Sequence, residues 1–171
     1  MGVLAVCALV VGVLGGDSFK FAGLEYQHRF SKGDLHEWTP TAQADLNKWK
    51  DMVTLNVYRH VKSGEDLAKA ANSVLETYKA NQAVVVRTNS VPRTDKAEAE
   101  HLIVVLFPRP DLIEASFARF YIRSGFGYSL VYGHRVYGKK AGNDMSTWLK
   151  ANGPSIEKSL MAMVPPKPPA K

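Results

Sequence analysis

The residues best suited to binding gather on one predicted surface, formed by two strands within residues 114–137. Arg119 and Tyr121 lie in the first strand, and Tyr132 and His134 lie in the second. All four share a face, because alternate side chains of a strand point the same way. Aromatic rings interleaved with guanidinium groups hold single-stranded nucleic acids, anionic sugars and peptides. The alternative is that a helix covers this face and the arginine is paired or lies at its edge.

Two further arginines, Arg87 and Arg109, are candidate binding residues because they accompany loops that prolines stiffen. Pro108 and Pro110 flank the second of them directly. Loops displayed from a rigid sheet often carry binding residues, although Pro-Arg pairs are also common in ordinary loops. Together the arginines predict a partner that is either a protein or a small anionic ligand.

No set of residues in the sequence has the spacing of a recognisable catalytic site. Ser155 and Lys158 fit the Ser-x-x-Lys spacing of penicillin-binding proteins, and Pro154 places the serine at a predicted helix start. The other motifs of those enzymes are missing, and an exposed helical turn explains the spacing equally well. We therefore predict no catalytic residue and regard the chain as more typical of a non-enzyme.

The five histidines of the chain do not form a recognisable metal motif. His28 and His36 could face each other across a hairpin, with Glu37 adjacent, but the HExxH pattern is absent. A single cysteine excludes a zinc site built on several thiolates. Histidines on the surface of a sheet account for this pattern, so we predict no metal and no cofactor.

The elements that position these residues follow from hydrophobic periodicity and turn signals. The clearest is a helix after Ser63, whose apolar residues fall on one continuous stripe through Tyr78. The residues Asn152-Gly153-Pro154 predict an interruption in a last helical stretch that Asn143 or Asp144 would cap. The other predicted elements are strands at 19–30, 35–39, 52–60, 83–88 and 101–107, and a short helix at 41–50.

A strong hairpin signal joins the two strands at 114–123 and 128–137 through Ser124-Gly-Phe-Gly127. Taking these four residues as the loop places Arg119 opposite Tyr132. Both faces of the hairpin are largely apolar, which means that a layer must cover each side of the sheet.

These elements predict an α+β fold with a mainly antiparallel sheet of about seven strands, flanked by helices on both faces as an α/β/α sandwich. One domain spans residues 17–163, and a flexible tail rich in proline and lysine occupies 164–171. The element order and the stretch Trp49-Lys-Asp-Met-Val-Thr-Leu-Asn-Val57 resemble the Mog1/PsbP-like group. The resemblance implies a small accessory or binding protein, and it transfers no functional residue.

The N-terminal run Val3–Leu14 is apolar and is followed by Gly15-Gly16. As a helix it would be about 18 Å long, too short for a hydrocarbon core of about 30 Å. It predicts a signal peptide over 1–16, and hence a periplasmic or secreted protein that is not integral to the membrane after cleavage. No Lys or Arg precedes the run, and the alternative is a buried first strand or helix.

Composition separates the remaining function classes. Lys and Arg number 22 against 16 Asp and Glu in 171 residues, and a net charge of +6 is well short of a strong phosphate-binding footprint. We predict an exported accessory or binding protein of the cell envelope, without catalytic activity and without a nucleic-acid partner. The alternatives are a nucleic-acid-binding module that uses the aromatic-basic hairpin, or a small hydrolase. The sequence does not address the oligomeric state.

Overall fold

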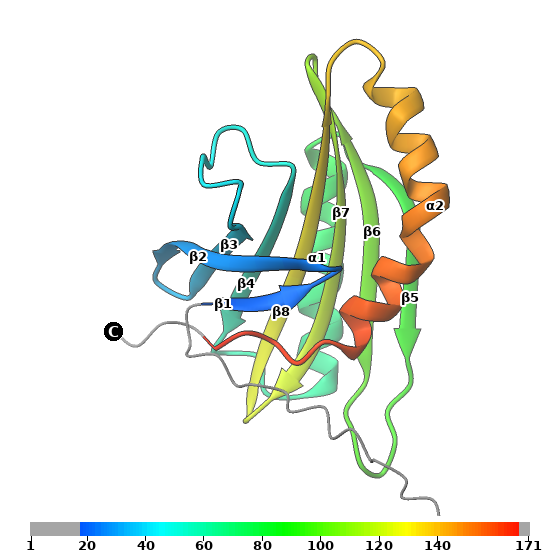
Figure 1. Cartoon of the computed structure of the whole chain (residues 1–171). Coiled ribbons are helices and arrows are strands. Elements are labelled where there is room, and N and C mark those ends of the chain that lie inside the picture. Colours follow the sequence, from blue (N-terminus) through cyan, green and yellow to red (C-terminus); the bar gives the residue numbers. More distant parts are fainter. Residues whose placement is uncertain (1–17, 168–171) are drawn as a thin grey trace, which may run out of the picture.

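The computed structural model of the chain describes residues 18–167, so the predicted signal peptide lies outside the described residues (Figure 1). Within that range one antiparallel sheet has the strand order β1-β2-β3-β4-β8-β7-β6-β5. The elements in chain order are β1 (Ser18–Phe21), β2 (Leu24–Lys32), β3 (Leu35–Pro40), β4 (Asp51–Tyr58), α1 (Gly64–Ala80), β5 (Val84–Val91), β6 (Glu100–Pro108), β7 (Leu112–Arg123), β8 (Phe126–Tyr137) and α2 (Ala141–Ala162).

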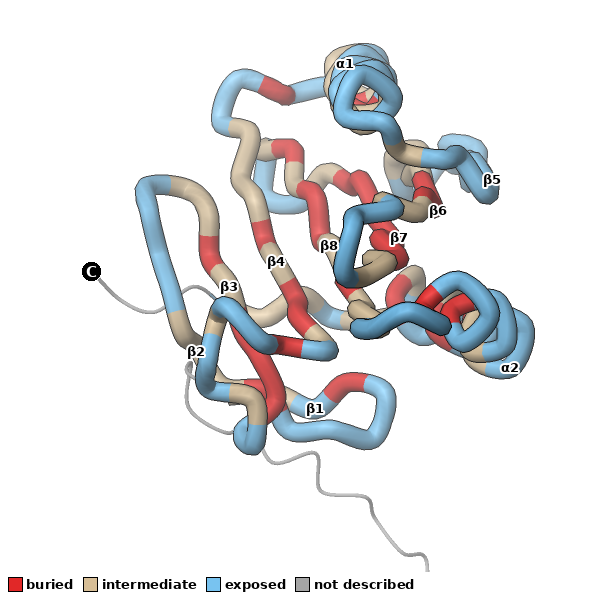
Figure 2. Tube along the Cα trace, turned by 90° about the horizontal axis from the view of Figure 1, so that it is seen from above, coloured by how far each residue is buried: buried red, intermediate tan, exposed pale blue. Residues whose placement is uncertain are grey.

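The sheet is sandwiched between the two helices, which lie on opposite sides of it (Figure 2). On one face α1 packs mainly against β6 and β7, and on the other face α2 packs against β7 and β8. The predicted α/β/α sandwich is therefore confirmed, with eight strands in place of about seven. Within residues 18–167, no helix is both long and apolar enough to cross a membrane.

The additional strand comes from a tight turn that the sequence did not reveal. The predicted strand 19–30 is in fact β1 and β2, joined at Ala22 and Gly23, whose φ values are 47° and 80°. Two consecutive positive φ angles are typical of the two-residue hairpin turn that Asn-Gly usually forms. Alanine gives no such signal in the sequence, so the turn was missed.

The predicted helix at 41–50 is wrong, because this segment forms turns and bends instead. The Gln43 side chain accepts hydrogen bonds through Oε1 from the backbone N–H groups of Lys50 and Asp51, at 2.7 and 2.8 Å. Trp49 is buried against the sheet. These contacts fold the segment back as a loop, and they outweigh its helix signals.

The β7–β8 hairpin forms, but its predicted register is wrong by two residues. Arg119 lies opposite Leu130, and Phe117 lies opposite Tyr132. The turn consists of Ser124 and Gly125 alone, both with positive φ, while the next two residues belong to β8. A shift of two residues keeps every side chain on its predicted face.

The α1 start is confirmed, whereas α2 differs from its prediction. Ser63 accepts a hydrogen bond from the backbone N–H of Asp66 at 3.1 Å and caps α1. α2 begins at Ala141 without a side-chain cap and continues through Pro154, so both the predicted caps and the predicted break are wrong. Burial of its inner face, including Ile156, stabilises the helix across the proline.

At Gly127 of β8 the structure leaves no space for a side chain. A Cβ there would stand 2.5 Å from Cγ1 and 2.6 Å from Cβ of Val61. We expect Gly127→Ala to lower the free energy of unfolding by about 1–3 kcal/mol through overpacking, measured by urea denaturation. Gly142→Ala is the control, because its Cβ would make only an ordinary 3.8 Å contact. Equal stability of the two variants would contradict this account.

Candidate functional site

The structure places Arg119 inside the protein, where its guanidinium joins three elements. Nε and Nη2 each donate a hydrogen bond of 2.7 Å to Glu100 of β6. Nη1 donates to the carbonyls of Leu160 and Met163, at 3.1 and 2.8 Å, where α2 ends. A cation at a helix C-terminus also interacts favourably with the helix dipole. With 8% of its surface exposed, this residue holds α2 on the sheet.

The other candidates lie on the same side of the sheet as Arg119, and two of them contact Trp148 of α2. Tyr121 is buried and stacks on Tyr128 with ring centroids 5.3 Å apart. Tyr132 is buried too, and the His134 ring stacks on Trp148 of α2 at 3.8 Å. The structure therefore brings the four residues to one face, as predicted, and α2 covers the part of it that holds Arg119, Tyr132 and His134.

Asp51, at the start of β4, contacts the polar atoms of Tyr132 and His134 on this face. Its Oδ1 accepts a hydrogen bond from the Tyr132 hydroxyl and lies 2.8 Å from Nδ1 of His134, while Oδ2 accepts one from Gln43 at 3.0 Å. Burial by itself raises the pKa of the Asp51 carboxyl, but the hydrogen bonds from His134, Gln43 and Tyr132 outweigh it and hold the pKa below its usual range. The charged carboxylate is therefore a stabilising part of the fold.

An aspartate beside a histidine can serve as an oriented general base, provided that a nucleophile is near. In the described part of the chain, His134 forms a side-chain hydrogen bond only with Asp51, and the Tyr132 hydroxyl donates to the same carboxylate oxygen. Ser155 lies inside α2 rather than at a helix start and donates to the Asn152 carbonyl. His134 connects the sheet to α2 through its stack on Trp148, whereas Ser155 bonds only within the helix.

The two loop candidates contact different partners. Arg87 belongs to edge strand β5, and its Nη1 lies 3.3 Å from Glu157 of α2. Arg109 lies between β6 and β7, with its guanidinium 5.5 Å from the centre of the Phe107 ring. Neither joins the buried face around Arg119.

His28 and His36 are not directly opposite each other in the β2–β3 hairpin, where their cross-strand neighbours are Trp38 and Ser31. A hydroxyl links their rings. Ser31 Oγ lies 2.8 Å from Nε2 of His28 and 2.7 Å from Nδ1 of His36. Among the described residues, no group of three or more His, Cys, Asp or Glu side chains is placed to hold a metal ion.

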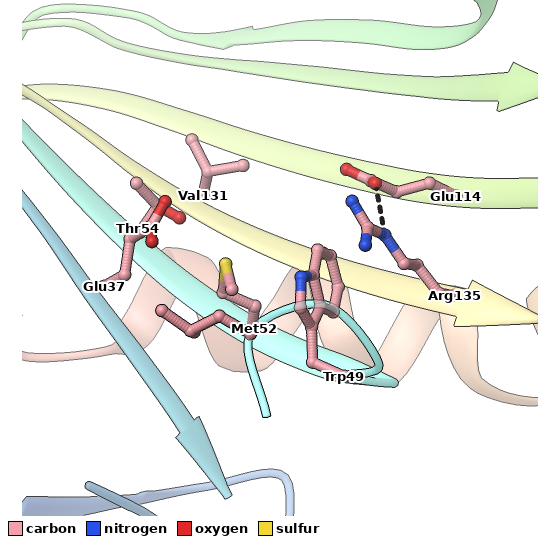
Figure 3. A pocket seen from close by; sticks show the side chains of 9 residues that line it. Glu37, Trp49, Met52, Thr54, Glu114, Val131 and Arg135 are labelled. Carbon is pink, nitrogen blue, oxygen red and sulfur yellow. Dashed lines mark hydrogen bonds and ion pairs between the residues drawn. The ribbon is translucent and has the colours of Figure 1, made fainter. Parts of the chain in front are cut away.

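A cleft that the sequence patterns do not indicate lies on the α1 side of the sheet, over β4 and β8 (Figure 3). Its volume is about 290 Å³. We name it the β4–β8 cleft after its two floor strands; the loop 41–50 and strands β3 and β7 supply its walls. The residues that line it are Glu37, Leu46, Trp49, Met52, Thr54, Glu114, Val131, Gly133 and Arg135.

At one end of the β4–β8 cleft, the side chains of Arg135, Glu114 and Trp49 contact one another. Arg135 Nε donates to Glu114 at 2.7 Å, and the Arg135 guanidinium lies 3.7 Å from the centre of the Trp49 ring. The indole in turn packs over Gly133, where a Cβ would stand 3.0 Å from the ring. These contacts fix the indole and the guanidinium in place.

Glu37 occupies the other end of the cleft beside Thr54, its direct cross-strand neighbour (Figure 3). Burial raises the pKa of the Glu37 carboxyl, and the positive charge of Arg135 opposes this effect. Within residues 18–167 the carboxylate has neither a hydrogen bond nor an ion pair. The strand pattern in the sequence shows that Glu37 and Thr54 alternate with buried residues, but not that their strands are neighbours.

Comparison with known proteins gives information on the fold alone. No family model matches the chain, and no curated protein matches it in sequence. A solved structure of a Pseudomonas aeruginosa protein of unknown function is similar with a TM-score of 0.51 and 10% identity, covering 89% of this chain and 97% of that one.

Two other solved structures are similar at lower scores. The Ran-binding protein Mog1p of Saccharomyces cerevisiae has a TM-score of 0.49 at 10% identity, with 79% of this chain and 78% of that chain covered. A STAR-related lipid transfer protein of Xanthomonas axonopodis has a TM-score of 0.34 at 8% identity, covering 80% and 97%. The α+β sandwich that the predicted resemblance implies is present in the structure. The likeness to solved structures concerns the fold alone and indicates no specific protein.

Proposed function

We propose that the protein is an exported accessory or binding protein of the cell envelope, without catalytic activity, that holds a partner protein or a small ligand in the β4–β8 cleft. The observation that carries the proposal is the cleft itself, in which Glu37 has no partner in the described part of the chain. Open, partly apolar depressions with a few placed polar groups are where proteins bind ligands.

The rigidity of the cleft supports a binding role. Its floor consists of two adjacent strands, β4 and β8, whose residues Met52 and Gly133 are direct neighbours. Trp49 and Arg135 are fixed by packing and by the ion pair to Glu114. Sites built on strands keep their geometry better than sites built on loops, so little ordering would be required on binding.

The position of Arg119 bears on the nucleic-acid alternative. That alternative depends on guanidinium groups presented between aromatic rings. The Arg119 guanidinium is bound to Glu100 and to α2 carbonyls, and the surrounding rings face α2. A binding protein that uses the opposite side of the sheet is therefore the better supported proposal.

The export part of the proposal is tested by the intact mass of the protein from fractionated cells of its host. We expect a mature chain that starts near Gly16, recovered from the envelope or the medium. An uncleaved chain in the cytosol would contradict export and would make the apolar start part of the folded protein.

A further inference from the structure

Glu37 is the feature of the β4–β8 cleft that points to a class of ligand, and the inference rests on the proposed binding function. The cleft is lined by two carboxylates, Glu37 and Glu114, and by one guanidinium, Arg135. The latter two neutralise each other through their 2.7 Å contact. One negative charge is left at the Glu37 end, without an ion pair in the described part of the chain.

A partly buried carboxylate without a counterion is unfavourable, because burial removes water from the charge. A cation beside it would restore the lost interaction, and an anion would be repelled. The adjacent Thr54 hydroxyl adds an acceptor for an N–H donor. The Glu37 end of the cleft therefore suits a positively charged donor.

The space next to Glu37 suits an aliphatic chain. Figure 3 shows Met52 and Val131 between the Glu37 end and the Trp49 end of the cleft. Leu46 also lines this part. A volume of about 290 Å³ is at the lower limit of pockets for drug-sized molecules, which begin near roughly 300 Å³. A short chain with one polar head is of suitable size.

We propose that the β4–β8 cleft binds a primary ammonium or guanidinium group on a short aliphatic stem, with the cation at Glu37 and the stem on Met52 and Val131. The same chemistry is offered by a lysine or arginine side chain of a partner protein and by a free alkylamine. It differs from the anionic ligand predicted from the sequence. The anionic ligand was predicted from several arginines, and two of these, Arg87 and Arg119, lie beside carboxylates of the protein itself.

The test is a titration of the full mature protein, monitored by the NMR shift of the Trp49 indole N–H. The probes are n-butylammonium, n-butanol and butyrate, which share the stem and differ in the charge of the head. We expect a saturable shift with the ammonium probe at millimolar Kd, and at least about tenfold weaker binding of the other two. Saturation by butyrate or butanol at the same concentration would overturn the proposal.

Glu37→Gln keeps the size of the side chain and removes its charge, so it should weaken butylammonium binding at least about tenfold. Glu25→Gln is the matched control, because Glu25 is an exposed carboxylate of β2 outside the cleft. Unchanged thermal unfolding of both variants shows that the fold is intact. Equal binding by the wild type and Glu37→Gln would contradict the assignment.

A blocked Ala-Lys-Ala peptide distinguishes the two sources of the cation. Tighter binding of the peptide than of n-butylammonium indicates a protein partner, and equal binding indicates a small amine; both support the cationic head. If neither the peptide nor n-butylammonium binds, but a substitution in the β4–β8 cleft still abolishes binding to the partner in cells, the proposed ligand class is wrong and the proposed binding function stands. If cross-linking from the cleft also fails, the proposed function itself is contradicted.

Discussion

Arg119→Met is expected to destabilise the protein by about 3 kcal/mol, the lower end of the range for breaking a buried ion pair. The change leaves Glu100 without its two hydrogen bonds and leaves the carbonyls of Leu160 and Met163 without their donor. The Glu100 side chain is 26% exposed, so water partly replaces the arginine and the loss stays near this lower limit. Urea denaturation followed by circular dichroism measures it.

Two further variants make the result specific. Arg119→Lys keeps the charge but cannot form the bidentate contact, so its stability should fall between those of the wild type and Arg119→Met. Arg123→Met, at the exposed end of the same strand, should change stability by less than about 0.5 kcal/mol. A loss below about 1 kcal/mol for Arg119→Met would mean that the guanidinium does not hold α2 on the sheet.

Asp51→Asn is expected to cost about 2–3 kcal/mol at neutral pH, since it weakens hydrogen bonds to a charged, nearly buried group. The expected effect depends on pH. Because the folded state lowers the pKa of Asp51, its contribution is fully present above the unfolded pKa of about 3.9 and is lost as the pH falls through the lower folded value. The wild type should therefore lose more stability on acidification than the variant does.

The measurement is the free energy of unfolding at a series of pH values from neutral to acid, for wild type and Asp51→Asn. Asp95→Asn, in the exposed loop between β5 and β6, is the control and should follow the wild type throughout. A constant difference between wild type and Asp51→Asn at every pH would show that the carboxylate does not contribute through its charge.

The fold could be predicted from the sequence wherever one local signal determined the answer. The apolar stripe after Ser63 correctly predicted α1, and the stretch Ser124-Gly-Phe-Gly127 correctly predicted a hairpin, although not its register. Errors occurred where tertiary contacts outweigh local signals. Trp49 packs on Gly133 and keeps 41–50 from forming a helix, and burial carries α2 through Pro154.

The candidate sites show the same limit. Alternation in the strands placed Arg119 and His134 on one face correctly, but it could not show that α2 covers this face. The β4–β8 cleft was missed because Glu37 and Arg135 come from strands far apart in sequence. The strands β3, β4 and β8 are neighbours because of the strand order in the sheet. Hydrophobic periodicity predicts where strands lie in the sequence, but not which strands are neighbours.

The central claim, that this protein acts by binding through the β4–β8 cleft, is tested most directly by photo-cross-linking in its own host. A benzophenone amino acid replaces Leu46 at the rim of the cleft, or Lys158 on the exposed side of α2 as the control. We expect a discrete adduct from position 46 that disappears with Thr54→Arg, since the new cation would occupy the place beside Glu37. Adducts from position 158 alone, or adducts from position 46 that persist in Thr54→Arg, would contradict the claim.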